Sequence, residues 1–156
     1  TEGDVLIDGK SVNYDDFDLS QVGILIEDPG FYPHLTGFEN LEMLYTINNK
    51  KDFDYIKSVL DRVGLLDAAF KKYKEYSLGM RQRLGIAQAI MENPNLIILD
   101  EPMNGLDKKG IEDVKELLLK LKGDGKTILM ASHYAEDMEI CDEVFQMEDG
   151  KLGDMK

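Results

Sequence analysis

The stretch that decides the fold is Leu96-Ile97-Ile98-Leu99-Asp100-Glu101-Pro102. Its apolar half predicts a short strand that is buried on both faces of a sheet. Two adjacent carboxylates, Asp100 and Glu101, follow at the C-terminal end of this strand, which is where open α/β sheets bind their ligands. Two acids in that place are costly unless a cation or a reacting group uses them.

This acidic pair has two interpretations. In nucleotide hydrolases the first acid of such a pair holds Mg²⁺, and a neighbouring acid orients or activates a water molecule. In the alternative, the stretch is an ordinary strand that ends in a solvated turn.

Strands and helices alternate around this stretch. Before it, residues 22–26 form a compact apolar strand. After it, residues 111–121 carry apolar side chains at helical spacing, and residues 126–131 form another strand. A short helix at about 134–141 and a strand at 144–147 complete the pattern. This alternation predicts an α/β fold with a parallel, helix-covered sheet.

Residues 37–90 are mostly helical and predict a separate lobe. The pair Thr36 and Glu39 has the spacing of a capping box, in which each side chain bonds the other residue's backbone amide at the start of a helix. Two more helices are predicted over residues 52–63 and 79–91 from the spacing of their apolar side chains.

The length and composition exclude several classes of protein. The chain has 156 residues, which suits one domain, and a net charge of −13 from 31 acidic and 18 basic side chains. This charge disfavours binding to nucleic acid or anionic lipid, because such partners require Lys and Arg patches. The single cysteine, Cys141, cannot form an internal disulfide, and the longest apolar runs are far shorter than the roughly 20 residues that span a bilayer. We therefore expect a soluble domain from a reducing, intracellular compartment.

Two further motifs carry chemistry. Ser77 and Gly79 lie where the third predicted helix of the lobe begins, so backbone amides and a hydroxyl converge in an arrangement that binds anions. The alternative is a serine that only caps a surface helix. Ser132 and His133 directly follow the strand at 126–131, although a lone histidine in this position is more often a packed or surface residue.

The order of these motifs resembles that of the ATPase domain of ABC transporters. Residues 76–82 match the family's signature motif, with Leu78 where the first glycine is usual and Met80 where a glutamine is usual. The other matches are the Walker B aspartate at Asp100, the catalytic glutamate at Glu101, the D-loop aspartate at Asp107, the H-loop histidine at His133, and the Q-loop position, where Glu27 replaces glutamine. Glu27 and the Ser-Leu-Gly-Met signature look most like those of the bacterial bacitracin and lantibiotic-type exporters.

The resemblance implies a fold and a division of the chain. The fold would be the parallel sheet of a P-loop NTPase, of the RecA-like type, with its helices and an added helical ABC subdomain. Residues 1–36 would hold an antiparallel strand and the Q-loop. Residues 37–90 would form the helical subdomain with the signature motif. Residues 91–156 would form the RecA-like core with the Walker B, D-loop and H-loop motifs.

The resemblance also implies a function. The parent protein would be the ATP-binding subunit of an ABC transporter, an ATPase that couples hydrolysis to the export of a peptide antibiotic or a drug through a transmembrane permease. It would lie in the cytoplasm at the inner face of the cell membrane. Two ATPase domains, identical or different, would meet head to tail, so that the signature motif of one contacts the γ-phosphate held by the other.

Individual residues receive roles by the same resemblance. Glu101 would polarise the attacking water, and His133 would contact the γ-phosphate. Asp100 would reach Mg²⁺, and Glu27 would act near the metal and the permease-facing loop. The expected ATP-binding residues are Ser77, Leu78, Gly79, Met80 and Gln82 of the signature motif, Asp107 of the D-loop, which would cross the dimer interface, and Glu27.

Such a domain needs a phosphate loop of the form G-x-x-x-x-G-K-[ST], which does not occur in these 156 residues. Gly9-Lys10-Ser11 comes near it, but the first glycine would have to stand at Asp4, and Gly3 is one place too far. We interpret this segment as the antiparallel strand that follows the phosphate loop in the family, so the P-loop fold would be incomplete here. We therefore expect the isolated chain to be inactive as an ATPase. The explanation we favour is that the loop belongs to a part of the protein not included in these 156 residues. A natural protein that lacks the loop is less favoured.

Three alternative functions stay open. An ABC-type protein without a permease, such as a ribosome-associated factor, would usually show tandem domains or a basic face, which the charge of −13 disfavours. A chromosome-maintenance ATPase would need a long heptad insertion, and the sequence has none. The chain could also be a non-catalytic interaction module, which ATP turnover by the complete protein would distinguish from the enzyme.

Overall fold

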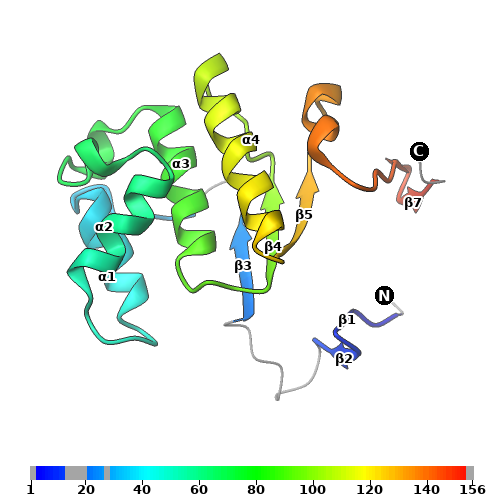
Figure 1. Ribbon diagram of the computed structural model, residues 1–156, viewed down its shortest axis with the longest axis horizontal. Coiled ribbons are helices and arrows are strands. Elements are labelled where there is room, and N and C mark those ends of the chain that lie inside the picture. Colours follow the sequence, from blue (N-terminus) through cyan, green and yellow to red (C-terminus); the bar gives the residue numbers. More distant parts are fainter. Residues whose placement is uncertain (1–2, 13–20, 27–28, 154–156) are drawn as a thin grey trace.

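The core of the described structure is a three-stranded parallel sheet (Figure 1). The computed structural model describes three stretches of the chain, residues 3–12, 21–26 and 29–153. The strands, in the order in which they lie side by side, are β3 (Val22–Leu25), β4 (Leu96–Asp100) and β5 (Thr127–Ala131). Leu25 is aligned with Leu99, and Leu99 with Met130, so the C-terminal ends of the strands lie at one edge of the sheet. The predicted α/β class and parallel sheet are confirmed.

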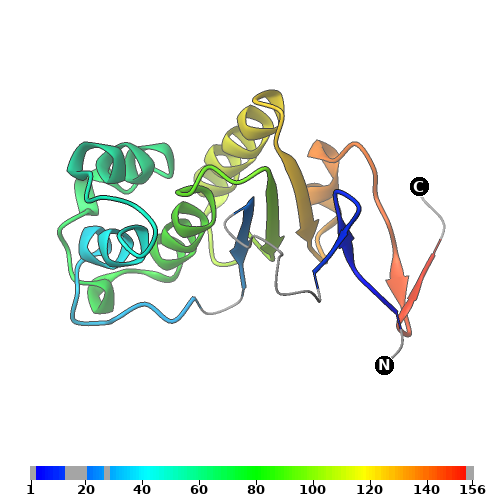
Figure 2. The same ribbon diagram turned by 90° about the horizontal axis from the view of Figure 1, so that it is seen from below.

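Helices form a lobe at one end of the molecule and cover the sheet beside it. The α-helices of the described residues are α1 (Gly37–Tyr45), α2 (Phe53–Arg62), α3 (Leu78–Ile90) and α4 (Lys108–Gly123). The lobe contains α1 and α2, while α3 lies between the lobe and the sheet, and α4 crosses one face of the sheet (Figures 1 and 2). The short 3-10 helices are η2 (Leu66–Ala68), η3 (Tyr73–Glu75) and η4 (Ala135–Ile140). The segment predicted as a short helix at 134–141 is therefore a 3-10 helix.

Two small antiparallel hairpins lie at the end of the molecule opposite the lobe (Figure 2). Their strands are β1 (Leu6–Ile7) and β2 (Lys10–Ser11), then β6 (Met147–Glu148) and β7 (Lys151–Leu152). In the first hairpin Asp8 and Gly9 form the turn with φ angles of 50° and 75°, as a type I′ turn requires. The segment that the sequence analysis interprets as an antiparallel strand is therefore part of a hairpin closed by Gly9. The strand predicted at 144–147 is wrong for its first three residues, because they pair with no strand in the described structure.

Helices cover only one face of the sheet in the described part of the chain. Gly23, Leu25, Ile97 and Leu99 alternate along β3 and β4 and are buried on the covered face. On the opposite face, Ile24 is 43% exposed and Leu129 is 58% exposed. The expectation that residues 96–99 are buried on both faces is therefore corrected. An apolar run predicts two covered faces only when covering elements are available on both sides.

Close backbone contact fixes α3 against β3. A Cβ atom on Gly23 would lie 1.8 Å from the carbonyl oxygen of Ala89, and a Cβ atom on Gly85 would lie 2.5 Å from Cδ1 of Leu25. Interiors are packed too densely to absorb such overlaps without a shift of the backbone. The two glycines therefore set how closely α3 approaches the sheet.

The capping box and the helices predicted in the lobe are present in the structure. The Thr36 hydroxyl accepts from the Glu39 amide at 3.1 Å, and the Thr36 amide donates to the Glu39 carboxylate at 2.7 Å. This amide holds the pKa of the Glu39 carboxyl below its usual value. The helices predicted at 52–63 and 79–91 form within two residues of those bounds. Phe53, the first apolar side chain of the helix predicted at 52–63, is 45% exposed.

Replacing Gly23 by alanine should destabilise the fold. The new methyl group would push against the Ala89 carbonyl, and overpacking of this kind typically costs about 1–3 kcal/mol. We expect the thermal midpoint of the complete protein to fall by several degrees. Gly123→Ala is the matched control, because a Cβ there meets nothing within 4 Å; it should leave the midpoint unchanged or raise it. Equal midpoints for the two variants would contradict the close contact of α3 with β3.

Candidate active site

The parallel pairing of β4 and β5 brings an acid and a histidine together. The Glu101 amide donates to the Ala131 carbonyl at 2.9 Å, which continues the pairing one residue beyond β4. His133 follows β5 by two residues, and its Nδ1 lies 2.6 Å from Oε1 of Glu101. The Glu101 side chain is 27% exposed and that of His133 is 65% exposed, so solvent and ligands can reach this pair. The predicted strand-end site is therefore an acid–imidazole pair open to solvent.

The protonation of His133 limits which partners it can contact at once. A neutral imidazole that donates from Nδ1 to a carboxylate keeps a lone pair on Nε2 and accepts there, whereas the imidazolium donates from both nitrogens. His133 can therefore hold Glu101 and donate to a phosphate oxygen together only as the cation. Otherwise, it must release one partner to bind the other.

Glu101 adopts a backbone conformation that non-glycine residues rarely use. Its φ is +47°, in the left-handed region, which typically costs on the order of 1 kcal/mol or more and persists only when the surroundings hold it. Its carbonyl accepts from the Asn104 amide at 3.0 Å and from Nε2 of Gln82 at 2.9 Å. No sequence signal marks this conformation, because glutamate carries no preference for it.

A buried acid supports the loop that carries His133. Asp137 is 3% exposed, and its Oδ2 accepts from the Ser132 hydroxyl at 2.8 Å. The same hydroxyl accepts from the Tyr134 amide at 3.1 Å, and Lys115 lies 3.9 Å from the other Asp137 oxygen. These contacts fix the chain on both sides of the histidine. The sequence analysis missed Asp137, because one acid in the acidic segment 136–143 gives no distinguishing signal.

The signature residues lie at the start of α3. The Ser77 hydroxyl caps the helix by accepting from the Met80 amide at 3.3 Å, so the capping role weighed as an alternative is present. A hydroxyl that accepts in this way still has its proton to donate, and capping therefore leaves anion binding open. Ser77 and Leu78 are exposed, Gly79 is partly buried, and Met80 packs partly buried against the core.

The D-loop packs against this helix start. A Cβ atom on Gly105 would lie 2.5 Å from the Leu78 side chain, and one on Gly79 would lie 3.1 Å from the Gly105 carbonyl oxygen. Asp107 caps α4 by accepting from the Gly110 amide at 2.8 Å. The structure thus brings the signature and D-loop residues together, while Glu27 lies outside the described residues.

Tyr76 anchors the residue before the signature serine. Its hydroxyl donates to the Ala68 carbonyl at 2.8 Å, and burial raises the pKa of Tyr76 to about 12. A Cβ atom on Gly37 would lie 2.1 Å from this hydroxyl. The neutral phenol therefore ties the start of α3 to α1 and η2.

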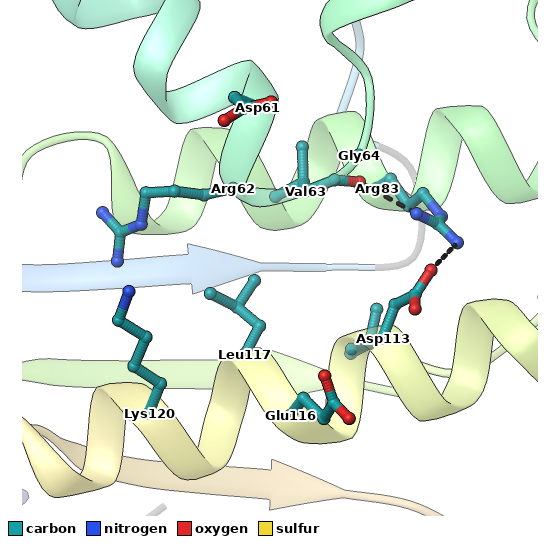
Figure 3. A pocket seen from close by; sticks show the side chains of 10 residues that line it. Asp61, Arg62, Val63, Gly64, Arg83, Asp113, Glu116, Leu117 and Lys120 are labelled. Carbon is teal, nitrogen blue, oxygen red and sulfur yellow. Dashed lines mark hydrogen bonds and ion pairs between the residues drawn. The ribbon is translucent and has the colours of Figure 1, made fainter.

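Arg83 joins α3 to both the lobe and α4 (Figure 3). It donates to the Val63 carbonyl and to Oδ2 of Asp113, each at 3.1 Å. Its guanidinium fills space left by two glycines, since a Cβ on Gly64 would lie 2.6 Å away and one on Gly110 would lie 3.1 Å away. Val63, Gly64, Arg83 and Asp113 line a cleft of about 380 Å³ between α2, α3 and α4. The cleft is separate from the acid–histidine pair, because Glu101 and His133 are not among its lining residues.

The carboxylates suit Mg²⁺ only in company with phosphate. No group of three or more His, Cys, Asp or Glu side chains that could hold a metal occurs within residues 3–12, 21–26 and 29–153. Mg²⁺ is commonly bound by one or two carboxylates together with substrate phosphates and waters. Asp100 is exposed at the end of β4, beside Glu101. The donor set therefore fits a nucleotide-dependent magnesium site.

Known proteins resemble this chain in sequence and in structure. Residues 1–104 match the family described as ABC transporter. The bacitracin transport ATP-binding protein BcrA of Enterococcus faecalis is 43% identical over 97% of this chain and 50% of its own length. The lantibiotic transport ATP-binding protein SrtF of Streptococcus pyogenes is 35% identical over 97% of this chain and 66% of its own length. The solved dimeric ATP-binding cassette MJ0796, in a post-hydrolysis state with ADP and Pi, superposes with a TM-score of 0.90 at 27% identity, over 100% of this chain and 73% of its own.

The chain spans about half the length of the curated relatives it matches. No helix in the described residues is long and apolar enough to cross a membrane. The family match covers more than half of the chain, and the solved cassette shares its whole described fold. The chain therefore belongs to the ABC transporter family and has the fold of its ATP-binding cassettes.

Proposed function

We propose that the complete protein hydrolyses ATP and uses the energy to drive export through a membrane permease. The observation that carries this proposal is the Glu101 carboxylate, held 2.6 Å from the His133 imidazole at the C-terminal edge of the parallel sheet. Relatives that carry bacitracin transport and lantibiotic transport in their names support a peptide antibiotic or a similar drug as the exported substrate.

In this proposal Glu101 is the catalytic base. Its carboxylate polarises the water that attacks the γ-phosphate, and His133 contacts a γ-phosphate oxygen. Asp100, with Glu27, holds Mg²⁺, which when bound neutralises charge on the phosphates. Because Glu101 and His133 already contact each other, phosphate binding must recruit the imidazolium or draw His133 away from Glu101. When His133 moves away, a lone pair of the Glu101 carboxylate becomes free to accept from the attacking water; when the imidazolium stays, it contacts Glu101 and the phosphate together.

The signature residues act, in this proposal, on the nucleotide of a second ATPase domain, identical or different. The amides after Ser77 and its hydroxyl point out of the start of α3, where the helix dipole favours a phosphate. Leu78, Gly79 and Met80 shape this end, and Asp107 lies beside the partner domain. The solved cassettes with this fold are described as dimeric, which supports the assembly.

The helical lobe is the proposed side for the permease. The Tyr32 backbone is held by the buried Asn40 amide, with hydrogen bonds of 2.8 Å and 3.2 Å, while its side chain is exposed. At the edge of the lobe, Phe53 and Phe70 are 45% and 60% exposed and stack 6.3 Å apart. Rigid, exposed aromatic side chains are typical of protein interfaces. This docking would place the protein in the cytoplasm at the inner face of the membrane.

We propose the same division of the chain as in the sequence analysis: a first part at 1–36, the helical subdomain at 37–90 and the RecA-like core at 91–156. The structure adds one refinement. The helix α3 belongs to the lobe by sequence, yet it contacts β3 through Gly23 and Gly85. Movement of the lobe that includes α3 would therefore reach the sheet directly.

Glu101→Gln should abolish hydrolysis in the complete protein and preserve ATP binding. The amide keeps the size of the side chain but cannot accept the water's proton, so turnover should fall at least about 100-fold. Phosphate release and ATP affinity would be measured side by side. The matched control is Glu112→Gln on the exposed surface of α4, which should turn over normally. A loss below about 10-fold for Glu101→Gln would remove Glu101 from the role of base.

Complementation between two inactive variants should show whether Ser77 acts on the nucleotide of its own domain or on that of the opposite domain. One chain of the complete protein carries Ser77→Arg, and the other carries an inactivated phosphate loop. If Ser77 serves the opposite nucleotide, both lesions fall on one composite site, and the second site stays intact. We expect the mixture to recover ATPase activity that neither mutant shows alone. Activity no higher than that of the two separate mutants would contradict the assignment across the dimer.

A further inference from the structure

Gln82 directs its side chain to the backbone of Glu101 in its own chain. Its Nε2 donates to the Glu101 carbonyl at 2.9 Å, between partly buried residues of α3 and the end of β4. The resemblance placed Gln82 among the residues that bind ATP. In this structure its side-chain nitrogen is engaged with a carbonyl of its own chain.

This bond acts at a residue whose backbone lies in the left-handed region. Three backbone hydrogen bonds hold Glu101 in the described structure: its amide to Ala131, and its carbonyl to the Asn104 amide and to Gln82. The first two come from the sheet and from the turn that Glu101 itself begins. Only the third comes from α3. Because φ at Glu101 is +47°, loss of one support favours relaxation of the backbone and movement of the carboxylate.

We propose that Gln82 is a positioning residue that holds Glu101 in its left-handed conformation and makes it sensitive to the placement of α3. This inference rests on the proposed function. Ser77 lies five residues earlier, or about 7.5 Å along the helix at a rise of 1.5 Å per residue. A nucleotide that engages Ser77 from the opposite domain would thus set the position of the Gln82 amide. Nucleotide binding at one site of the dimer would thereby influence the position of Glu101 in the other site.

The neighbouring residue makes this link stiff. Arg83 is held by the Val63 carbonyl on one side and by Asp113 of α4 on the other. Tyr76 fixes the residue before the helix through the Ala68 carbonyl. The start of α3 is therefore tied both to the lobe and to α4, and in this inference a displacement of α3 reaches Glu101 through Gln82.

The test compares Gln82→Met with Gln82→His in the complete protein. Methionine has the length of glutamine without a donor, whereas the histidine Nε2 offers a donor at a similar reach. We expect kcat to fall at least about 10-fold for the methionine variant, since misplacement by 1 Å can cost about 100-fold. The histidine variant should recover part of that loss. The control is Gln88→Met, the same replacement at another partly buried position of α3, which should change kcat less than twofold.

ATP affinity separates positioning from nucleotide binding. In a Glu101→Gln background, where hydrolysis is blocked, adding Gln82→Met should leave the dissociation constant for ATP within twofold. If Gln82→Met does not fold, Gln82→Asn replaces it, because its amide is one methylene too short to reach Glu101.

Three results would overturn the inference: an unchanged kcat, an affinity loss as large as the loss in kcat, or a histidine variant no better than the methionine one. Failure of the proposed function would look different, because the unmodified protein would then release no phosphate from ATP, or Glu101→Gln would retain turnover.

Discussion

The site depends on the parallel pairing of β4 with β5. This pairing sets Asp100 beside Ala131 and continues through the Glu101 amide to the Ala131 carbonyl. It brings the acid that follows one strand to the histidine that follows the next, although the two are 32 positions apart in the sequence. The support from Asp137 and the left-handed turn at Glu101 only refine a geometry that the sheet has already imposed.

The helix α3 connects this site with the rest of the molecule. Its C-terminal half is held on β3 by glycine contacts, its start is capped by Ser77, and its middle reaches Glu101 through Gln82. Because one rigid helix carries all three contacts, the lobe cannot shift α3 without affecting the Glu101 backbone.

Much of the fold could be predicted, because it depends on local patterns. The apolar run 96–99 and the capping box at Thr36 are short-range signals, and both are confirmed. The sequence pattern could not predict that helices cover only one face of the sheet in the described residues. That coverage depends on which elements, distant in the sequence, pack against the sheet. The left-handed Glu101 and the bond from Gln82 were missed for the same reason: the two residues are 19 positions apart, and their contact exists only once α3 lies on the sheet. The family motifs identified Glu101 and His133 as site residues. They did not identify the contacts of Gln82 and Asp137 that support these two residues.

The central claim is that this cassette forms an ATP hydrolase together with a second ATPase domain, identical or different. It is tested most directly by Mg²⁺-dependent phosphate release from ATP by the complete protein, measured over a wide range of protein concentration. The account predicts turnover whose rate per molecule rises with concentration and then levels off, because each site needs residues from two domains. ATP binding without phosphate release at every concentration would contradict it and identify a non-catalytic module.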